Sequence, residues 1–279
     1  MKQRVISACI GLVLLAAVLA FFETPVFNAA ISVIVMLAVY EVLQAAGCAK
    51  NRALLAVSCL YSGSIPFIPY LFAAKIFPLV SFCYIAVLFL FLLGFHSEIS
   101  ALQVGFVFFI STILPFALTV SIYLRDREGS SAACFLILLG LIGAWVSDTG
   151  AYFAGRAFGR HPLAPQVSPK KTVEGSVGGV LCCLLGFLLI GAVYPWASQR
   201  FFGIQAEVNL PLVLFISPFV SVAGMLGDLT ASVIKRQNGV KDYGNIMPGH
   251  GGVMDRFDSV LFTVPTVFMF AQWLTLIRV

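Results

Sequence analysis

The chain has 279 residues, of which 60% are hydrophobic and only 10% are charged. In a typical soluble domain about a quarter of the residues are charged. This chain is far more apolar, and a single core surrounded by water could not bury so much apolar surface. The formal net charge of +5 is modest and argues against a nucleic acid as a partner. We therefore expect an all-α, polytopic membrane protein that forms one membrane domain over residues 1–279.

Nine segments are apolar and long enough to cross a bilayer, which takes about 20 residues in a helix. They are Val5–Phe22, Pro25–Ala46, Ala53–Ala74, Ile76–Phe95, Ala101–Leu124, Ser131–Ala154, Ser176–Trp196, Leu210–Leu226 and Ser259–Ile277. The third and fourth segments are separated by little more than Lys75. No small-residue cleavage site follows Phe22, so we expect the first segment to be a retained anchor and not a signal peptide.

The Lys and Arg residues predict the orientation of these spans. With nine helices and a cytoplasmic N-terminus, most of the 17 Lys and Arg residues fall on the inner side, in agreement with the positive-inside rule. The outer side keeps Lys75, Arg125, Arg127, Arg200 and Arg278. The same orientation places the two longest polar loops, Gly155–Gly175 and Gly227–Asp258, on the cytoplasmic face, where they can build one site.

Two carboxylates lie within expected spans, where each costs at least ~2.5 kcal/mol in the hydrocarbon region. Glu41 lies towards the cytoplasmic end of the second span, which favours an interfacial position or a polar contact between helices over catalysis. Asp148 lies late in the sixth span, among glycines at 143, 150 and 155 that allow another helix to approach closely. Asp148 is therefore either a hydrogen-bonding partner between helices or a functional residue.

The loop at 159–175 contains three prolines, which exclude a regular helix. Ser168, Lys170, Lys171 and Thr172 combine two cations with two hydroxyl groups, a set suited to phosphate oxygens. The alternative is a basic turn that is attracted to anionic lipid at the membrane surface.

The segment from Gly227 to Asp258 concentrates the remaining charge. On a helix that continues from the eighth span, Asp228, Ser232, Lys235 and Arg236 share one face. Asp255 and Asp258 lie at i and i+3 where the ninth span begins, and they too share a face. The glycines between the two groups allow backbone N–H groups to approach an anion.

This combination of groups favours phosphoryl or nucleotidyl transfer, which relies on carboxylates, cations and Gly-rich turns. Carboxylates from two helix ends suit Mg²⁺, which takes one or two carboxylates together with water and substrate phosphates. The non-enzyme alternative is an ion-coupled membrane transporter. The carboxylates lie at helix ends and in a polar loop, whereas transporter sites lie near the bilayer midplane, so an enzyme is favoured.

Three blocks of the sequence resemble a known family. The run Ser232-x-x-Lys-Arg-x₄-Lys-Asp-x-Gly…Pro-Gly-His-Gly-Gly-x-x-Asp-Arg-x-Asp258 is similar to the signature of the phosphatidate cytidylyltransferases (CDP-diacylglycerol synthases). Ser147-Asp-Thr-Gly-Ala-Tyr-Phe-Ala-Gly-Arg156 and Ser168-Pro-Lys-Lys-Thr-Val-Glu-Gly175 resemble that family as well. We therefore interpret 131–279 as the catalytic half and 1–130 as N-terminal helices of low motif content. One departure is Ala231, where the family usually has Glu.

The resemblance implies transfer of a cytidylyl group from CTP to phosphatidate, giving CDP-diacylglycerol and pyrophosphate in phospholipid biosynthesis. The location implied is the inner (cytoplasmic) membrane, with the active site facing the cytoplasm and membrane lipids as further partners. An alternative enzyme is a CTP-dependent lipid-alcohol kinase, which would release CDP. The sequence leaves open whether the chain forms a homodimer.

The resemblance also implies roles for individual residues. Mg²⁺ is expected on Asp228 and Asp255, and the sequence leaves open whether a second cation such as K⁺ joins it. Lys235, Arg236 and Lys241 are the other expected catalytic residues. The expected substrate-binding residues are Asp148, Ser168, Lys170, Lys171, Ser232, His250, Arg256 and Asp258.

Overall fold

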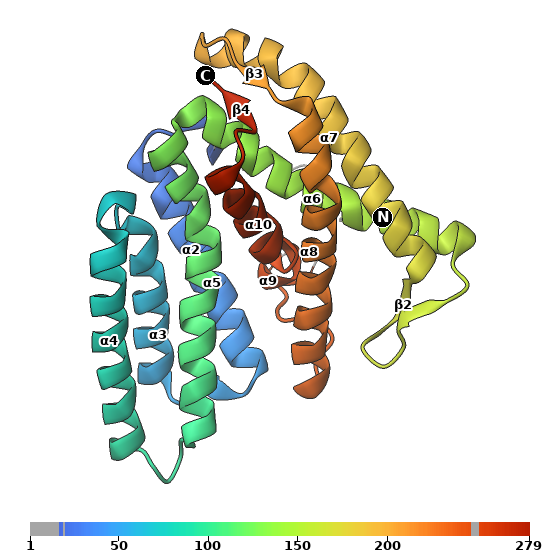
Figure 1. Ribbon diagram of the computed structural model, residues 1–279. Coiled ribbons are helices and arrows are strands. Elements are labelled where there is room, and N and C mark those ends of the chain that lie inside the picture. Colours follow the sequence, from blue (N-terminus) through green and yellow to red (C-terminus); the bar gives the residue numbers. More distant parts are fainter. Residues whose placement is uncertain (1–16, 19, 247–250) are drawn as a thin grey trace. The chain divides into compact units, whose positions relative to one another are not determined.

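The computed structural model describes residues 17–18, 20–246 and 251–279 (Figure 1). The chain divides into two units, residues 1–126 with 237–256, and residues 127–236 with 257–279. The polypeptide therefore passes between the units three times. The third passage follows Arg256, inside the segment that carries the strongest sequence motif.

Six helices in the described part of the chain are long and apolar enough to cross a membrane. They are α2 (Pro25–Ala45), α4 (Tyr70–Gly94), α5 (Ala101–Glu128), α6 (Ser130–Phe158), α7 (Val173–Phe202) and α8 (Leu210–Gln237). This helical content agrees with the predicted all-α, polytopic membrane protein. Most of the first expected span lies outside the described residues, and both the count of nine spans and the orientation stay predictions.

The expected boundary at Lys75 is wrong. Helix α3 (Arg52–Ser64) ends early and is followed by the 3₁₀ turn η2 (Ile65–Phe67), and α4 begins at Tyr70 and contains Lys75. Pro66 lies in this break and Pro69 at its end; proline lacks an N–H donor, and Ile68, the residue before Pro69, is extended. A single lysine has no such effect, so the chain turns at the prolines.

The last expected span is also shorter than predicted. Helix α9 (Met254–Phe257) is followed by a turn and by α10 (Val260–Trp273), and the chain then forms β4 (Ile277–Arg278), which pairs antiparallel with β3 (Glu207–Val208). Asp255 lies in α9 and Asp258 in the turn, so the continuous helical face expected for this pair is interrupted. Hydropathy located the apolar segment but not the turn within it.

In the first unit, buried hydroxyl groups join the helices drawn from blue to green in Figure 1. The rings of Tyr61 in α3 and Tyr84 in α4 stack with their centroids 3.9 Å apart, and the Tyr84 hydroxyl donates to Ser58 Oγ over 2.7 Å. Ser62 Oγ donates to the carbonyl of Ser111 in α5 over 2.9 Å. The short 3₁₀ turn η1 (Cys48–Lys50) connects α2 to α3. Polar contacts of this kind hold helices together where all other surfaces are apolar.

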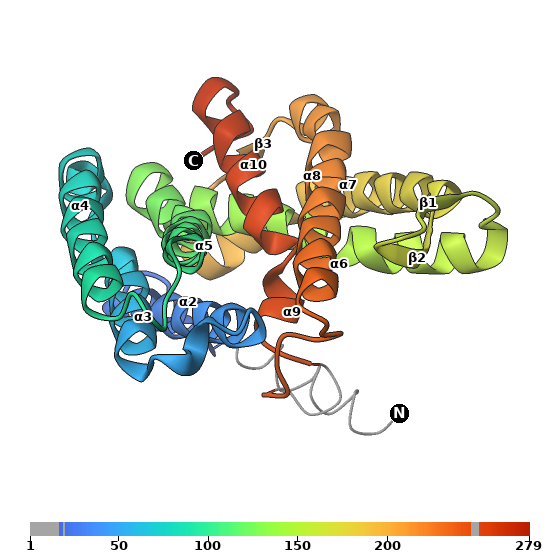
Figure 2. The ribbon, with the colours of Figure 1, turned by 90° about the horizontal axis from the view of Figure 1, so that it is seen from below.

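In the second unit, α6 is the central helix, and α7 runs antiparallel beside it (Figures 1 and 2). A Cβ atom built on Gly150 of α6 would lie 2.5 Å from Cys182 Sγ of α7, so the two helices approach through a glycine. A Cβ on Gly140 would lie 2.6 Å from a methyl group of Val264, which places α10 on another face of α6. The close approach expected from the glycines of this helix is confirmed.

Between α6 and α7 the chain forms an antiparallel hairpin of β1 (Pro162–Ala164) and β2 (Ser168–Thr172). The three prolines of this segment therefore exclude a helix, as expected. The hairpin carries the Ser168–Thr172 motif to the start of α7.

Substitution of Gly150 by Ala is expected to lower the free energy of unfolding by about 1–3 kcal/mol, because the added methyl group overpacks the α6–α7 contact. The matched control is Gly105→Ala in α5, where an added Cβ meets no atom within 4 Å. Thermal unfolding of the detergent-solubilised proteins measures both changes. Equal stability of the two variants would contradict the packing argument.

Candidate active site

Helix α8 carries a polar face beyond its apolar stretch. The helix continues to Gln237, so Asp228, Ser232, Lys235 and Arg236 share one face, as the spacing predicts. Ser232 Oγ donates to Asp228 Oδ1 over 3.3 Å, Lys235 is buried, and Arg236 is exposed. Two cations in the last turn also complement the negative end of the helix dipole.

The β1–β2 hairpin reaches this face through an ion pair between Lys171 Nζ and Asp228 Oδ2. Thr172, the next residue, is the N-cap of α7 and accepts a hydrogen bond from Gly175 N over 3.1 Å. Lys171 is therefore held at a fixed distance from a helix end. Both members of the pair remain about one-quarter exposed, so solvent and a ligand can reach them. Of the other two hairpin residues, Lys170 is exposed and Ser168 is half-buried.

Asp258 lies opposite this pair in the turn before α10. It is 8% exposed, and its Oδ1 accepts a hydrogen bond from Ser259 N over 2.8 Å. Burial, together with the nearby charge of Asp228, raises the pKa of Asp258 to about 7, although Lys235 acts in the opposite direction. A cation placed beside such a carboxyl group stabilises its ionised form.

Asp148 of α6 completes this group, because its Oδ2 accepts a hydrogen bond from Ser259 Oγ over 3.0 Å. Its charge also raises the pKa of Asp258. The backbone of α8 at Gly227 lies directly against the turn at Asp258 and Ser259, where a Cβ atom would not fit. We name Asp148, Asp228 and Asp258 the carboxylate cluster. It draws on three separate stretches of the sequence.

The first unit holds the other part of the predicted site. Asp255 Oδ2 accepts hydrogen bonds from Tyr243 N over 2.9 Å and from Gly252 N over 3.0 Å. Lys241 and Arg256 are exposed in the same unit. His250, predicted to bind substrate, lies outside the described residues.

The predicted site residues are thus divided between the units. The second unit brings together Asp228 with Lys171 and Ser232, and Asp258 with Asp148 and Lys235. Asp255, the expected partner of Asp228 in metal binding, belongs to the first unit, so this pairing stays a prediction. Among the residues that the structure describes, no group of three or more His, Cys, Asp or Glu side chains is arranged to hold a metal ion. The carboxylate oxygens of Asp228 and Asp148 nevertheless suit Mg²⁺, which needs only one or two carboxylates.

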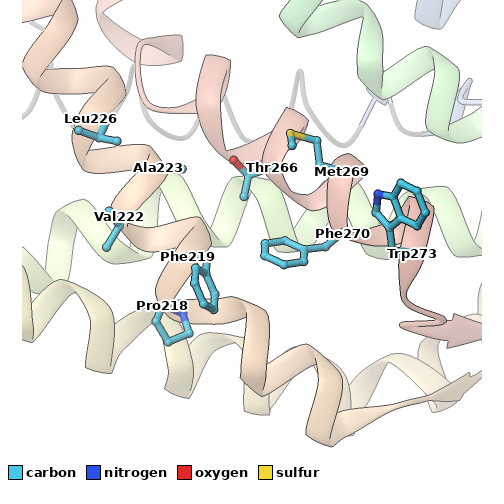
Figure 3. A pocket seen from close by; sticks show the side chains of 9 residues that line it. All are labelled: Pro218, Phe219, Val222, Ala223, Leu226, Thr266, Met269, Phe270 and Trp273. Atoms are coloured by element: carbon cyan, nitrogen blue, oxygen red, sulfur yellow. The ribbon is translucent and has the colours of Figure 1, made fainter.

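An apolar groove of about 650 Å³ lies between α8 and α10 in the second unit (Figure 3). Its lining residues are Pro218, Phe219, Val222, Ala223, Leu226, Thr266, Met269, Phe270 and Trp273. The rings of Phe219 and Phe270 are 5.5 Å apart. Leu226 is the lining residue nearest to Asp228 in the sequence, but residues two apart in a helix do not share a face, so the groove and the Asp228 side chain lie on different faces of α8.

Three contacts in these regions were missed by sequence reasoning. Ser259 was not singled out, although it bonds both Asp148 and Asp258. Glu174 accepts hydrogen bonds from Arg160 N over 3.0 Å and forms an ion pair with His161, which closes the base of the hairpin. Glu41 was interpreted as an interfacial or helix-contact residue, but it accepts two backbone hydrogen bonds from the loop before α9. An acidic residue within an apolar helix is the only sequence signal that pointed to Glu41.

Residues 2–274 match the sequence profile described as the cytidylyltransferase family. The chain belongs to the cytidylyltransferase family. It is 44% identical over 138 residues to the phosphatidate cytidylyltransferases of Staphylococcus epidermidis and Staphylococcus saprophyticus, and 41% identical over 138 residues to that of Staphylococcus aureus. In each case the match covers 50% of this chain and 49% of the relative, so the chain spans about half the length of the curated relatives it matches.

The raised pKa of Asp258 predicts how the stability of this cytidylyltransferase family member depends on pH. Because the folded-state pKa of about 7 lies above the usual aspartate value of 3.8, the wild-type protein loses stability as the pH rises between these values. Asp258→Asn removes this ionisation. The stability of the variant relative to wild type should therefore increase as the pH is raised from about 5 to about 7.

Thermal unfolding in detergent with EDTA, measured at several pH values, tests this expectation. The matched control is Asp126→Asn, which changes a partly exposed aspartate paired with Arg125. A difference between wild type and Asp258→Asn that does not change with pH would contradict the assignment.

Proposed function

We propose that this chain transfers a cytidylyl group from CTP to phosphatidate, giving CDP-diacylglycerol and pyrophosphate. The observation that carries the proposal is the family match over residues 2–274, together with relatives named phosphatidate cytidylyltransferase at 41–44% identity. The carboxylate cluster and its lysines support it, because they are groups that such a reaction uses.

The chemistry requires little from the protein as an acid or base. The nucleophile is a phosphate oxygen of phosphatidate, which is largely ionised near neutral pH because the second pKa of a phosphate monoester is about 6. This oxygen attacks the α-phosphorus of CTP and forms a new P–O bond. The bond from the α-phosphorus to the oxygen bridging it to the β-phosphate breaks, and pyrophosphate leaves with the electron pair. The main barrier is the repulsion between two anions.

The cations of the motifs are proposed to reduce this repulsion. Lys171 and Lys235 lie beside the carboxylates of the second unit, and Arg236 is exposed next to Lys235. On binding of substrate, Lys171 would exchange Asp228 for a phosphate oxygen, which leaves the Asp228 carboxylate available to a metal ion. From the motif, we assign further phosphate contacts to Lys170, Lys241 and Arg256.

We propose that Asp228 and Asp255 hold Mg²⁺, as the motif implies. When bound, Mg²⁺ supplies charge neutralisation of the phosphates and assists the departure of pyrophosphate. Titrating Mg²⁺, and then K⁺, into the metal-free protein while turnover is measured tests both the dependence on Mg²⁺ and the need for a second cation.

The lipid substrate is supported by the apolar groove between α8 and α10. Its almost wholly apolar lining suits an acyl chain of such a lipid. We further propose that the chain lies in the inner membrane with nine spans and a cytoplasmic N-terminus, so that CTP reaches the site from the cytoplasm. A homodimer remains compatible with this proposal.

Asp228→Asn and Asp255→Asn are each expected to lower turnover by roughly 100-fold or more, because each removes a proposed metal ligand. The assay supplies radiolabelled CTP, phosphatidate and Mg²⁺ to the detergent-solubilised protein and follows the labelled lipid. Asp126→Asn is the matched control and should retain activity. Near-wild-type turnover in either site variant would contradict the assignment of these aspartates as metal ligands.

The products of the same assay separate the alternatives. Cytidylyl transfer yields labelled lipid and pyrophosphate in equal amounts. A CTP-dependent lipid-alcohol kinase would release labelled CDP and would need a lipid alcohol. An ion-coupled transporter would show no turnover of CTP with either lipid.

Ala231 tests the one departure from the family motif. It is buried in α8, three residues after Asp228 and four before Lys235. Ala231→Glu places a carboxylate on the same helix face as Lys235, where the two can pair. We expect activity to be retained or raised, as measured by the CTP assay. Ala231→Gln is the control, since it adds similar volume without charge. A large loss in the Glu variant alone would show that the site does not accept the family residue.

A further inference from the structure

Glu41 is a carboxylate in an unusual setting. It lies in α2, one of the apolar spanning helices, and it is 1% exposed. A charge in such a place is unfavourable unless hydrogen bonds compensate it. Its Oε1 accepts a hydrogen bond from Val253 N over 3.0 Å, and its Oε2 accepts one from Met254 N over 2.8 Å. Each carboxylate oxygen therefore has a backbone donor from the loop before α9.

The loop is fitted closely to this carboxylate. A Cβ atom built on Gly244 would lie 2.5 Å from Glu41 Oε1, and a Cβ on Gly252 would strike the same carboxylate. Gly251, with φ of +84°, adopts a backbone conformation that favours glycine. The glycines of this motif thus allow the backbone to approach Glu41 from two sides.

The same turn also holds Asp255. Gly252 N donates to Asp255, and the next two N–H groups, of Val253 and Met254, donate to Glu41. Three successive backbone donors are therefore divided between two carboxylates. Because Glu41 binds the N–H groups of Val253 and Met254, it also fixes the direction of the neighbouring Gly252 N–H. The Asp255 carboxylate is held where this N–H points.

We propose that Glu41 is a positioning residue, which anchors the turn at 251–254 to α2 and thereby orients Asp255. The role of Asp255 in turnover rests on the proposed function, but the anchoring does not. Groups that orient a metal ligand typically change metal affinity or activity by about 10–100-fold when they are removed.

The test compares wild type with Glu41→Gln in two measurements. Gln keeps the size of the side chain but replaces one acceptor oxygen with an NH₂ group that faces a backbone donor. Hydrogen exchange of the peptide at 242–257 should become faster by about tenfold or more, because local opening is easier. The Mg²⁺ concentration for half-maximal turnover should rise by about 10–100-fold, with the KM for phosphatidate unchanged.

Ser32→Ala is the matched control. Ser32 is buried in the same helix and donates to Gly63 O over 2.7 Å, within the first unit but away from the loop. This variant should leave both the exchange of 242–257 and the Mg²⁺ midpoint unchanged. If Glu41→Gln is poorly folded, Gly244→Ala provides a second test, because its Cβ would meet the Glu41 carboxylate while the hydrogen bond from Gly252 N to Asp255 keeps both of its partners.

The outcomes separate this inference from the proposed function. Unchanged hydrogen exchange in Glu41→Gln and in Gly244→Ala would overturn the anchoring. Faster exchange with an unchanged Mg²⁺ midpoint would also overturn the inference, since it would limit Glu41 to a structural contact. Absence of CTP turnover in the wild-type protein would instead refute the proposed function, and the exchange measurement would still decide whether Glu41 holds the turn.

Discussion

The ion pair between Lys171 and Asp228 connects the β1–β2 hairpin to α8, and the arrangement of the second unit around the carboxylate cluster depends on it. Thr172 fixes the position of Lys171 by capping α7, and the close approach of α8 at Gly227 to the turn at Asp258 fixes the third carboxylate. In a chain with only 10% charged residues, few charges are available for such contacts. The three carboxylates of the cluster each have a partner: Asp148 accepts from Ser259 Oγ, Asp228 pairs with Lys171, and Asp258 accepts from Ser259 N.

The sequence was sufficient to predict the features that follow from local rules. The continuation of α8 past Leu226 follows from helix spacing, and the absence of a helix at 162–172 follows from the prolines, whereas the hairpin that forms there was not predicted. The break between Ser64 and Tyr70 and the turn in the last span were not predicted, because hydropathy measures the apolarity of a segment and not where its backbone turns. The contact of Glu41 with Val253 joins residues 212 positions apart, and no local pattern encodes such a distance.

Asp255 and Asp258 show why a sequence motif is not yet a site. They are three residues apart, but the chain passes from the first unit to the second between them. Asp255 is held by the backbone N–H groups of Tyr243 and Gly252, whereas Asp258 is buried beside another carboxylate. Identical side chains in one motif therefore have different surroundings, and a single role for both is not expected.

The charge balance of the second unit bears on the proposed chemistry. When the three carboxylates of the cluster are ionised, they face two ammonium groups, those of Lys171 and Lys235. Burial, together with the charges of Asp228 and Asp148, raises the pKa of Asp258. A triphosphate brought to the same place would add negative charge, so these two ammonium groups alone do not favour its binding. A divalent cation would bind to the excess carboxylates, and its positive charge would then attract the phosphates that the carboxylates alone repel. In the proposed reaction, a divalent cation bound between the carboxylate cluster and the phosphates would therefore allow both to lie at one site.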